Sequence, residues 1–381
     1  MIRIVQSQVS IVSLPLHTPF HTALRQTNEV TDIRVTLTLE DGTVGVGSTA
    51  PTPAITGETT ESIVTALQQF IFPALQSVEL ADRENVFQVL GRSIVHNTSA
   101  KAAVDIALHD LYAKQARLNL YDYLASHRRG AITGFSDNDD SMNLQSDALS
   151  HLPTLSTDAT VSLNSVEKMV TQGQNLVAVG FSTLKIKLGG RDGKDIERVA
   201  AIRQALGDDI VLRVDANQAW EVAESIAYVN QLAPYRVELV EQPIPAWNMK
   251  GLRQVTKNSP IPIVADESIF QFSDLQRLLD MRGADIINIK LMKTGGIHQA
   301  MQMIELIQDT NLQWMMGSMM EGPASMTAAA QLASAYGCSI VDLDAGYFLK
   351  HTHALGGIRY AGEAIHLPLA PGLGLEFAEL R

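Results

Sequence analysis

The chain has 381 residues, of which 46% are hydrophobic, and its 29 basic and 41 acidic residues give a formal net charge of −12. This length suits one large domain and a smaller one, because domains usually hold about 100–200 residues and α/β barrels reach about 250. The acidic balance argues against the basic surface that nucleic acids or anionic membranes require. Cys338 is the single cysteine, which excludes an internal disulfide and a thiolate metal cluster.

The sequence carries no targeting or membrane pattern. The first ten residues alternate polar and apolar side chains, without the apolar run of about 7–15 residues that a signal peptide needs. No stretch of about 18 uninterrupted apolar residues indicates a membrane span. We therefore predict a cytoplasmic protein without nucleic-acid or membrane partners.

Residues 1–126 are predicted to form a small α+β domain. Apolar residues alternate with polar ones over residues 33–39, Asp41-Gly42 supplies a tight turn, and the alternation resumes at Val44, which is a hairpin pattern. From about Glu61 to Leu124 the apolar period becomes helical. Residues 127–157 then become rich in Ser, Asn and Asp without a sustained period, which predicts an exposed linker or surface excursion rather than a site.

Short apolar or β-branched runs recur from residue 158 onward, separated by amphipathic helical stretches. The runs end 24 to 28 residues apart, at Leu163, Leu188, Asp215, Glu241, Asp266, Lys290, Ser318 and Asp344. Eight strand–helix units of this size favour a parallel α/β barrel over an open sheet. An open doubly wound sheet would normally show a Gly-rich phosphate loop after its first strand, and this sequence has none there. We predict the barrel over residues 158–350, followed by a segment over residues 351–381.

Three carboxylates end consecutive runs, and active sites of such barrels form at the strand ends. Asp215, Glu241 and Asp266 are expected to lie close together, where repulsion would force at least one to protonate unless a counter-charge is present. A divalent cation with oxygen ligands resolves this, and points to Mg²⁺, or to Mn²⁺, rather than zinc. The alternative is that each carboxylate pairs with a structural base.

Lys187 and Lys290 end runs that are four apart in a ring of eight, so they should face each other across the barrel mouth. A 1,1-proton transfer needs one base on each face of the substrate: one removes the α-proton and the other returns a proton to the opposite side. The neighbouring Lys185 ammonium and the metal would lower the pKa of such a base. The alternative for these lysines is a salt bridge to the metal carboxylates.

Asp342 and Asp344 end the eighth run, across the mouth from the predicted metal. Their side chains project to the same face, because they are two residues apart on a strand. Since the metal ligands are supplied elsewhere, this pair is predicted to bind a cation of the substrate, such as an α-ammonium. The alternative is a pair that caps a helix or binds a buried arginine.

These residues belong to segments that resemble a known family. The segments are Lys185-Ile186-Lys187, Val214-Asp215-Ala216-Asn217, Val240-Glu241-Gln242-Pro243, Ala265-Asp266-Glu267-Ser268, Asn288 to Gly296, Asp342-Leu343-Asp344, and, nearer the N-terminus, Pro19 to Arg25 and Pro53 to Gly57. The chain resembles the enolase superfamily in its muconate-lactonizing-enzyme-like subgroup, and within it the dipeptide epimerases of the L-Ala-D/L-Glu epimerase type. The resemblance covers nearly the whole chain apart from residues 131–152.

The resemblance implies a modified TIM-type (β/α) barrel with an N-terminal α+β capping domain, to which residues 351–381 return. It implies that the three carboxylates hold one Mg²⁺ per subunit, that Lys187 and Lys290 are the acid/base catalysts, and that Lys185 helps to stabilise an enolate. It also implies that substrate contacts come from Asp342, Asp344, Thr160 and, in a mobile loop of the cap, Arg25.

Some positions depart from the family pattern. Gly45-Val46-Gly47-Ser48 stands where relatives often carry Gly-Trp-Gly-Glu, and His21 replaces a commonly basic lysine. Met319 and Met320 follow the seventh run and could line the side-chain pocket, although methionines at this density more often fill a core. These departures admit hydrophobic dipeptides as well as Ala-Glu.

The predicted function is therefore a Mg-dependent dipeptide epimerase that inverts the α-carbon of the C-terminal residue through an enolate. The alternatives are an N-acylamino acid racemase, an o-succinylbenzoate synthase or a muconate-type cycloisomerase, whose substrates carry no ammonium for Asp342 and Asp344 to bind. A catalytically silent metal-binding protein is less favoured because the lysine pair is intact. Barrels of this kind often assemble symmetrically, so a homo-oligomer is possible.

Overall fold

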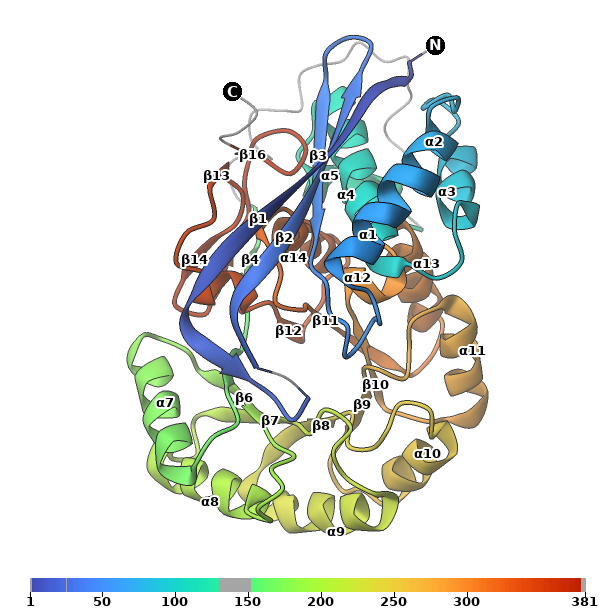
Figure 1. The fold of residues 1–381 in the computed structure, drawn as a ribbon. Helices are drawn as coiled ribbons and strands as arrows, with labels where there is room; N and C mark the ends of the chain where they lie inside the picture. The colour runs from blue at the N-terminus through green and yellow to red at the C-terminus, as the bar shows by residue number, and fades with distance from the viewer. Residues whose placement is uncertain (1, 25, 130–151, 378–381) are drawn as a thin grey trace.

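The computed structural model describes residues 2–24, 26–129 and 152–377. An antiparallel sheet with its helices packs against an eight-stranded parallel barrel (Figure 1). This confirms the predicted fold class, a TIM-type barrel with an N-terminal α+β domain. Within the described residues, no helix is long and apolar enough to cross a membrane.

The N-terminal sheet consists of β1 (Ile4–His21), β2 (Gln26–Leu39) and β3 (Val44–Thr49), in that order. Asp41 Oδ1 accepts a hydrogen bond from Thr43 N at 2.9 Å, and Gly42 has a positive φ of 84°, which closes the predicted turn. β3 lies against α4 (Thr98–Gln115) at a distance that only glycine permits: a Cβ on Gly47 would lie 2.0 Å from the Ala103 carbonyl oxygen.

Five further helical segments complete this domain, and they follow the predicted change from β to helical period at about Glu61. They are α1 (Thr60–Ala66), a π-helical segment (Leu67–Ile71), α2 (Phe72–Leu75), α3 (Arg83–Arg92) and α5 (Leu120–His127). Almost all of α4 is buried between these helices and the sheet. Glu58 caps α4, because its carboxylate accepts from Ser99 N at 2.9 Å and from Ala100 N at 3.2 Å.

Each of the eight predicted runs contains a strand of the barrel. The strands are β5 (Ala159–Val161), β6 (Thr183–Lys187), β7 (Val211–Asp215), β8 (Val237–Glu241), β9 (Ile263–Ala265), β10 (Ile286–Ile289), β11 (Gln313–Gly317) and β12 (Val341–Asp342). They are hydrogen-bonded in sequence order from β5 to β12. The two end strands meet where Asp158 N donates to the Val341 carbonyl at 3.2 Å, so the barrel is nearly closed.

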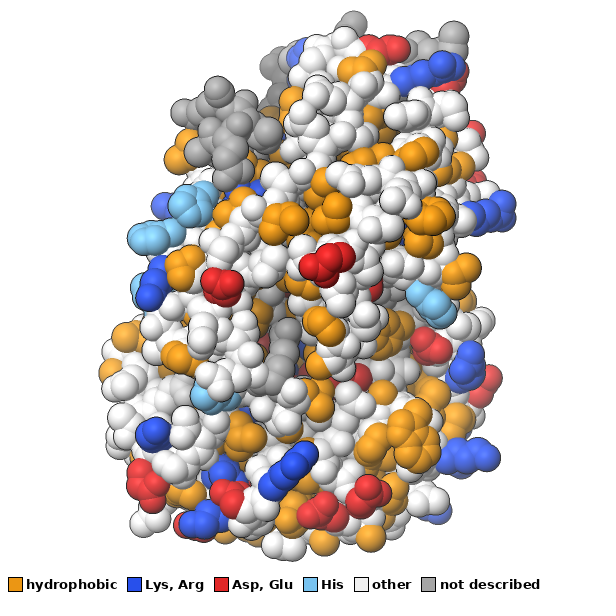
Figure 2. Space-filling view, in the orientation of Figure 1, with side chains coloured by type: hydrophobic (Ala, Val, Ile, Leu, Met, Phe, Trp, Pro, Cys, Tyr) orange, Lys and Arg blue, Asp and Glu red, His pale blue; other side chains and the backbone are white. Residues whose placement is uncertain are grey.

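Helices surround the barrel on its outer side (Figure 1). They are α7 (Val166–Ala178), α8 (Asp195–Leu206), α9 (Val222–Leu232), α10 (Met249–Lys257), α11 (Phe272–Met281), α13 (Ile297–Gln308) and α14 (Pro323–Ala335), with a short α12 (Leu291–Thr294) and 3₁₀ turns at Ala233–Tyr235 and Ala345–Phe348. Figure 2 shows acidic and basic side chains interspersed over these helices on the face in view, without a gathered basic patch.

A small apolar cluster fills the barrel on the side of the strand N-termini. It consists of Leu239, Val264, Ile286 and Met315. Leu239 is two residues before Glu241 and Val264 two before Asp266, so each shares the inward face of its strand with that carboxylate. The cluster therefore packs beneath the charged residues at the strand ends and supports them from inside the barrel.

The C-terminal segment packs on both domains. β13 (Ala354–Gly356) pairs with β16 (Leu375–Phe377), while β14 (Arg359–Ala361), β15 (Ala364–His366) and β4 (Thr154–Ser156) form another small sheet. Leu373 N donates to Asp110 Oδ1 of the N-terminal domain at 2.7 Å. β4 lies inside the predicted linker 127–157, and most of the predicted excursion over 131–152 lies outside the described residues. The domain boundaries stay predictions.

The N-terminal domain is also bonded directly to the barrel. Asp105 Oδ1 on α4 accepts from Ile297 N at 2.6 Å, and thus caps the N-terminus of α13. Gly296 makes this approach possible: its φ is 120°, and a Cβ there would lie 2.3 Å from the Asp105 side chain. The two domains are joined rigidly at this point.

Candidate active site

A pocket lies at the C-terminal ends of the barrel strands, covered by the tip of the β1–β2 hairpin. Phe20, Thr22, Leu24 and Ile55 line it from the N-terminal domain. The barrel contributes both charged and apolar residues: Thr160, Lys185, Lys187, Asn217, Lys290, Ser318, Met319, Met320, Asp342 and Asp344. The structure therefore brings eight of the twelve predicted site residues to one pocket.

The remaining predicted residues divide into two groups. Asp215, Glu241 and Asp266 are fully buried and contact the lysines that line the pocket. Arg25, the predicted substrate contact in the cap, lies outside the described residues. Met319 and Met320 are buried and face the pocket as expected.

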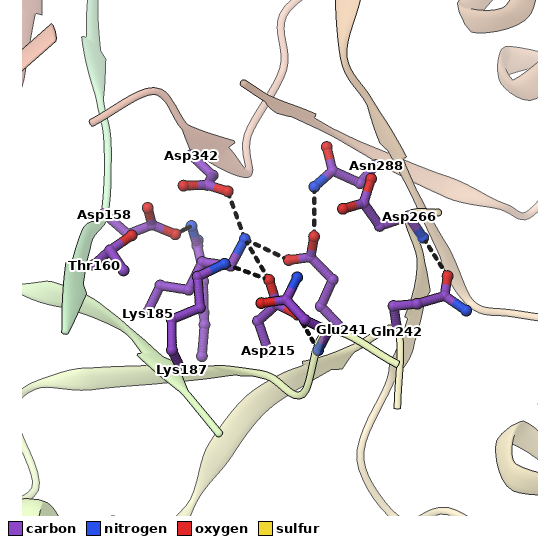
Figure 3. Close-up of polar contacts among 12 residues, drawn as sticks. Asp158, Thr160, Lys185, Lys187, Asp215, Glu241, Gln242, Asp266, Asn288 and Asp342 are labelled. Carbon is purple, nitrogen blue, oxygen red and sulfur yellow. Dashed lines mark hydrogen bonds and ion pairs between the residues drawn. The ribbon is translucent and has the colours of Figure 1, made fainter. Parts of the chain in front are cut away.

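Lys185 lies among three carboxylates (Figure 3). Its Nζ is 2.6 Å from Glu241 Oε2, 2.6 Å from Asp342 Oδ2 and 3.4 Å from Asp215 Oδ2. This is the salt-bridged arrangement that the sequence left open as the alternative for the lysines. Burial disfavours the charged ammonium, but the three carboxylates outweigh it and raise the pKa of Lys185 well above its usual value.

Lys187 and Lys290 are each paired with a predicted metal ligand. Lys187 Nζ lies 2.6 Å from Asp215 Oδ2, and Lys290 Nζ lies 2.7 Å from Asp266 Oδ2. Burial opposes the charge of Lys290, but Asp266 and Glu241 outweigh it and raise the pKa of this ammonium. A lysine base was expected to have a lowered pKa, but the pKa of Lys290 is raised as long as these carboxylates stabilise its ammonium form.

The predicted repulsion among the carboxylates is visible in Glu241. Burial and the neighbouring Asp215 carboxylate raise the pKa of Glu241 to about 7, although Lys185 and Lys290 act in the opposite direction. Asn288 Nδ2 also donates to Glu241 Oε1 at 2.8 Å, which fixes this side chain (Figure 3). The lysine ammonium groups hold the pKa values of Asp215 and Asp266 below their usual range, but they leave that of Glu241 raised.

The three carboxylates fit a divalent cation by their chemistry. All are fully buried, and they offer oxygen ligands alone, which suits Mg²⁺ or Mn²⁺. Glu241 Oε2 and Asp266 Oδ1 accept no well-aligned hydrogen bond from the described residues, although ammonium groups lie beside them. A cation would therefore satisfy acceptors that the protein leaves incompletely bonded.

A second cluster of carboxylates lies across the pocket from the first. One oxygen each of Asp158, Asp342 and Asp344 lies within 4.8 Å of the other two, and all three residues are buried. Asp344 Oδ2 accepts from Thr160 N at 2.6 Å. Burial and the Asp342 carboxylate raise the pKa of Asp344 to about 6.

Three charged residues beside the site were not predicted from the sequence. Asp158 and Arg213 form a buried ion pair, and Lys293 Nζ donates to the Asp266 carbonyl at 2.6 Å. Arg213 carries the clearest missed signal, because it is two residues before Asp215 and shares the inward face of β7. Asp158, before the first strand, gives no such signal.

Family models match both domains of the chain. Residues 4–125 match the mandelate racemase / muconate lactonizing enzyme N-terminal domain, and residues 168–381 match the enolase C-terminal domain-like family. An L-Ala-D/L-Glu epimerase of Clostridium acetobutylicum is 41% identical over 96% of this chain and 96% of its own length.

Two solved structures share the fold closely. A substrate-liganded L-Ala-D/L-Glu epimerase from Bacillus subtilis has a TM-score of 0.90 and 37% identity, and the match covers 98% of this chain and 99% of that one. A dipeptide epimerase from Enterococcus faecalis, complexed with Mg and the dipeptide L-Leu-L-Tyr, has a TM-score of 0.88 and 33% identity with the same coverage. The family resemblance of the motifs is confirmed: the chain belongs to the enolase superfamily, in the mandelate racemase and muconate lactonizing enzyme group.

Proposed function

We propose that this protein is a Mg-dependent dipeptide epimerase that inverts the α-carbon of the C-terminal residue of a dipeptide. The observation that carries the proposal is the joint presence, in one pocket, of two lysines on opposite sides and of the Asp342–Asp344 pair. The similar proteins from Bacillus subtilis and Enterococcus faecalis, which are dipeptide epimerases, support the assignment.

Lys187 and Lys290 would move the proton. One neutral lysine removes the α-proton, and the ammonium of the other donates a proton to the opposite face of the resulting enolate. Lys185, with its raised pKa, keeps its positive charge and stabilises the enolate oxygen. A base on each face is what distinguishes epimerisation from a one-sided proton exchange.

Asp215, Glu241 and Asp266 would hold Mg²⁺. The ion supplies positive charge that stabilises the carboxylate of the substrate as it becomes an enediolate. In the structure Asp215 and Asp266 form ion pairs with the ammonium groups of Lys187 and Lys290. Carboxylates that bind a divalent cation attract ammonium groups less strongly, so loading of the site would lower the raised pKa of Lys290.

Asp342 and Asp344 would bind the α-ammonium of the dipeptide. Both line the pocket, and Asp344 is bonded to the protein only through one side of its carboxylate within the described contacts. An N-acyl amino acid has no cation for this pair, and so the acylamino acid racemase and the cycloisomerases are second candidates. Met319 and Met320, with Phe20, Leu24 and Ile55, offer apolar contacts for side chains. The cytoplasmic location, the lack of a nucleic-acid partner and a homo-oligomeric state stay predictions.

Deuterium uptake tests the proposal. A library of acidic, basic and hydrophobic L,L-dipeptides is incubated in D₂O with Mg²⁺, with and without EDTA, and read by mass spectrometry. We expect a metal-dependent gain of one mass unit at the C-terminal residue. No uptake with any dipeptide, together with uptake by N-acyl amino acids, would move the assignment to the second candidates.

A further inference from the structure

The buried ion pair between Asp158 and Arg213 adjoins the Asp342–Asp344 pair and takes no part in the proton transfer described above. Asp158 directly precedes β5, Arg213 lies on β7, and both are buried. Arg213 Nη1 donates to Asp158 Oδ2 at 2.9 Å and to the Val341 carbonyl at 3.1 Å. One guanidinium group therefore bonds both sides of the junction between the first and last strands of the barrel.

This junction determines where Asp342 and Asp344 lie. Leu343 N donates to Thr157 Oγ1 at 2.8 Å, and Thr160 N donates to Asp344 Oδ2 at 2.6 Å. Val341, Leu343 and Asp344, in and after β12, are thus each bonded to residues in or just before β5. Arg213 strengthens the same junction from the interior of the barrel, where its bonds are shielded from water.

The carboxyl groups at the junction are crowded relative to the cations beside them, and burial and the Asp342 carboxylate raise the pKa of Asp158 well above its usual value although Arg213 acts in the opposite direction. The cations in contact with Asp158, Asp342 and Asp344 in the described part of the chain are Arg213 and Lys185. Each of these is shared with another acid, since Arg213 Nε lies 2.6 Å from Glu238 Oε2 and Lys185 also contacts Glu241. A further cation at this group would be stabilised.

Asp158 itself has an unsatisfied oxygen. Its Oδ1 is buried and accepts no hydrogen bond from any residue that the structure describes. Figure 3 shows Asp158 on the same side of the site as Asp342, away from Asp266 and Asn288. Asp158 does not line the pocket but lies beside Asp342 and Asp344, which do.

We propose that Asp158 and Arg213 are positioning residues for the amine end of the substrate, and that they make the pocket select a free ammonium over a neutral group of the same shape. An ammonium bound by Asp342 and Asp344 favours the ionised form of Asp158, which then attracts that ammonium as a third carboxylate, and Arg213 holds Asp158 and β12 in place. This inference rests on the proposed function, because it assumes that Asp342 and Asp344 face the α-ammonium of a dipeptide.

Calorimetric titration of the Mg-loaded protein tests this inference. The ligands are an L,L-dipeptide that the wild type exchanges and its des-amino analogue, in which hydrogen replaces the ammonium group. Asp158→Asn keeps an oxygen that can accept from Arg213 Nη1 but removes the charge. We expect the Kd of the dipeptide to rise at least about tenfold, because a buried charge that attracts the ammonium is lost, while the Kd of the analogue stays nearly constant.

Glu238→Gln is the matched control. It removes the outer partner of Arg213, whose side chain is 43% exposed, and leaves the charge of Asp158 in place. The ratio of the two Kd values should stay as in the wild type. Asp158→Glu restores the charge and should recover part of the preference, whereas a purely structural role would weaken both ligands alike.

An unchanged Kd ratio in a folded Asp158→Asn protein would overturn this inference and leave the proposed function standing. If the wild type neither binds nor exchanges any dipeptide, the proposed function fails and this inference fails with it. If Asp158→Asn does not fold, Asp158→Ser and Asp158→Glu form the replacement pair, and the same Kd ratio decides.

Discussion

Lys187 ends β6 and Lys290 follows β10, four strands apart in the eight-stranded sheet, and each lysine forms an ion pair with an aspartate of the candidate metal site. Lys187 is paired with Asp215 at 2.6 Å and Lys290 with Asp266 at 2.7 Å. Each side of the pocket therefore carries a lysine paired with an aspartate, and a reaction that runs in both stereochemical directions needs such a group on each side.

Replacing one lysine should separate epimerisation from proton exchange. Lys187→Ala and Lys290→Ala are each expected to lower epimerisation by about a thousandfold or more, because one face loses its acid/base group. Each variant should still exchange the α-proton of one stereoisomer in D₂O, measured by mass spectrometry with L,L- and L,D-dipeptides. Lys250→Ala, at an exposed position on α10, should change neither rate. Loss of all exchange in both site variants would contradict the two-base mechanism.

Metal removal should abolish activity and lower stability together. EDTA removes a cation that binds the folded protein and leaves Glu241 buried with a raised pKa, so Tm should fall and should recover when Mg²⁺ is added. Glu241→Gln should lose most of its affinity for Mg²⁺ in calorimetry. If the variant bound Mg²⁺ as tightly as the wild type, Glu241 would not be a ligand.

Neutralising Asp342 and Asp344 should change the preference for dipeptides over N-acyl amino acids more than it changes kcat. In the double variant Asp342→Asn and Asp344→Asn, KM for dipeptides should rise by about a hundredfold or more, because two buried charges that face the ammonium are lost. An N-acyl amino acid of the same shape should be affected far less. Equal losses for both substrates would favour the acylamino acid racemase reading.

Dipeptide affinity should fall with pH because of Asp344. Its pKa is raised to about 6 in the free protein by burial and by Asp342, so below about pH 6 the carboxyl group is protonated and neutral. The ammonium ligand favours the ionised form, and Kd should therefore rise as the pH falls from 7.5 to 5, by up to about tenfold per unit. The des-amino analogue should show a flatter profile. Matching profiles for the two ligands would exclude Asp344 as the cause.

The contact between the domains should matter for stability. Asp105→Ala removes the cap of α13 and leaves buried N–H groups without an acceptor, which should cost about 1–3 kcal/mol in urea unfolding. Asp82→Ala is the control, because Asp82 caps α3 through an exposed bond to Asn85 N and should cost about 0.5–1 kcal/mol. An equal cost for both would mean that the contact with the barrel adds nothing.

The strand ends could be predicted because each lies about one strand–helix unit after the last, and the barrel places all of them at one face. This was enough to bring Asp215, Lys187 and Lys290 to one site. Which carboxylate a lysine contacts depends on side-chain lengths across the barrel, and so the pairing of Lys185 with Asp342 could not be read from spacing. Asp158 was missed because it precedes its strand and carries no periodic signal.

Asp105 of α4 caps α13 and so bonds the N-terminal domain to the barrel, while other segments of that domain line the pocket. That contact fixes α4 to the barrel. The N-terminal domain reaches the pocket only through short segments around Phe20, Leu24 and Ile55, among the residues that the structure describes. The charged residues stand instead on strand ends supported by the barrel interior. A descendant of this protein can therefore acquire a different side-chain preference by substitutions in those short segments, while the proton-transfer machinery is inherited intact.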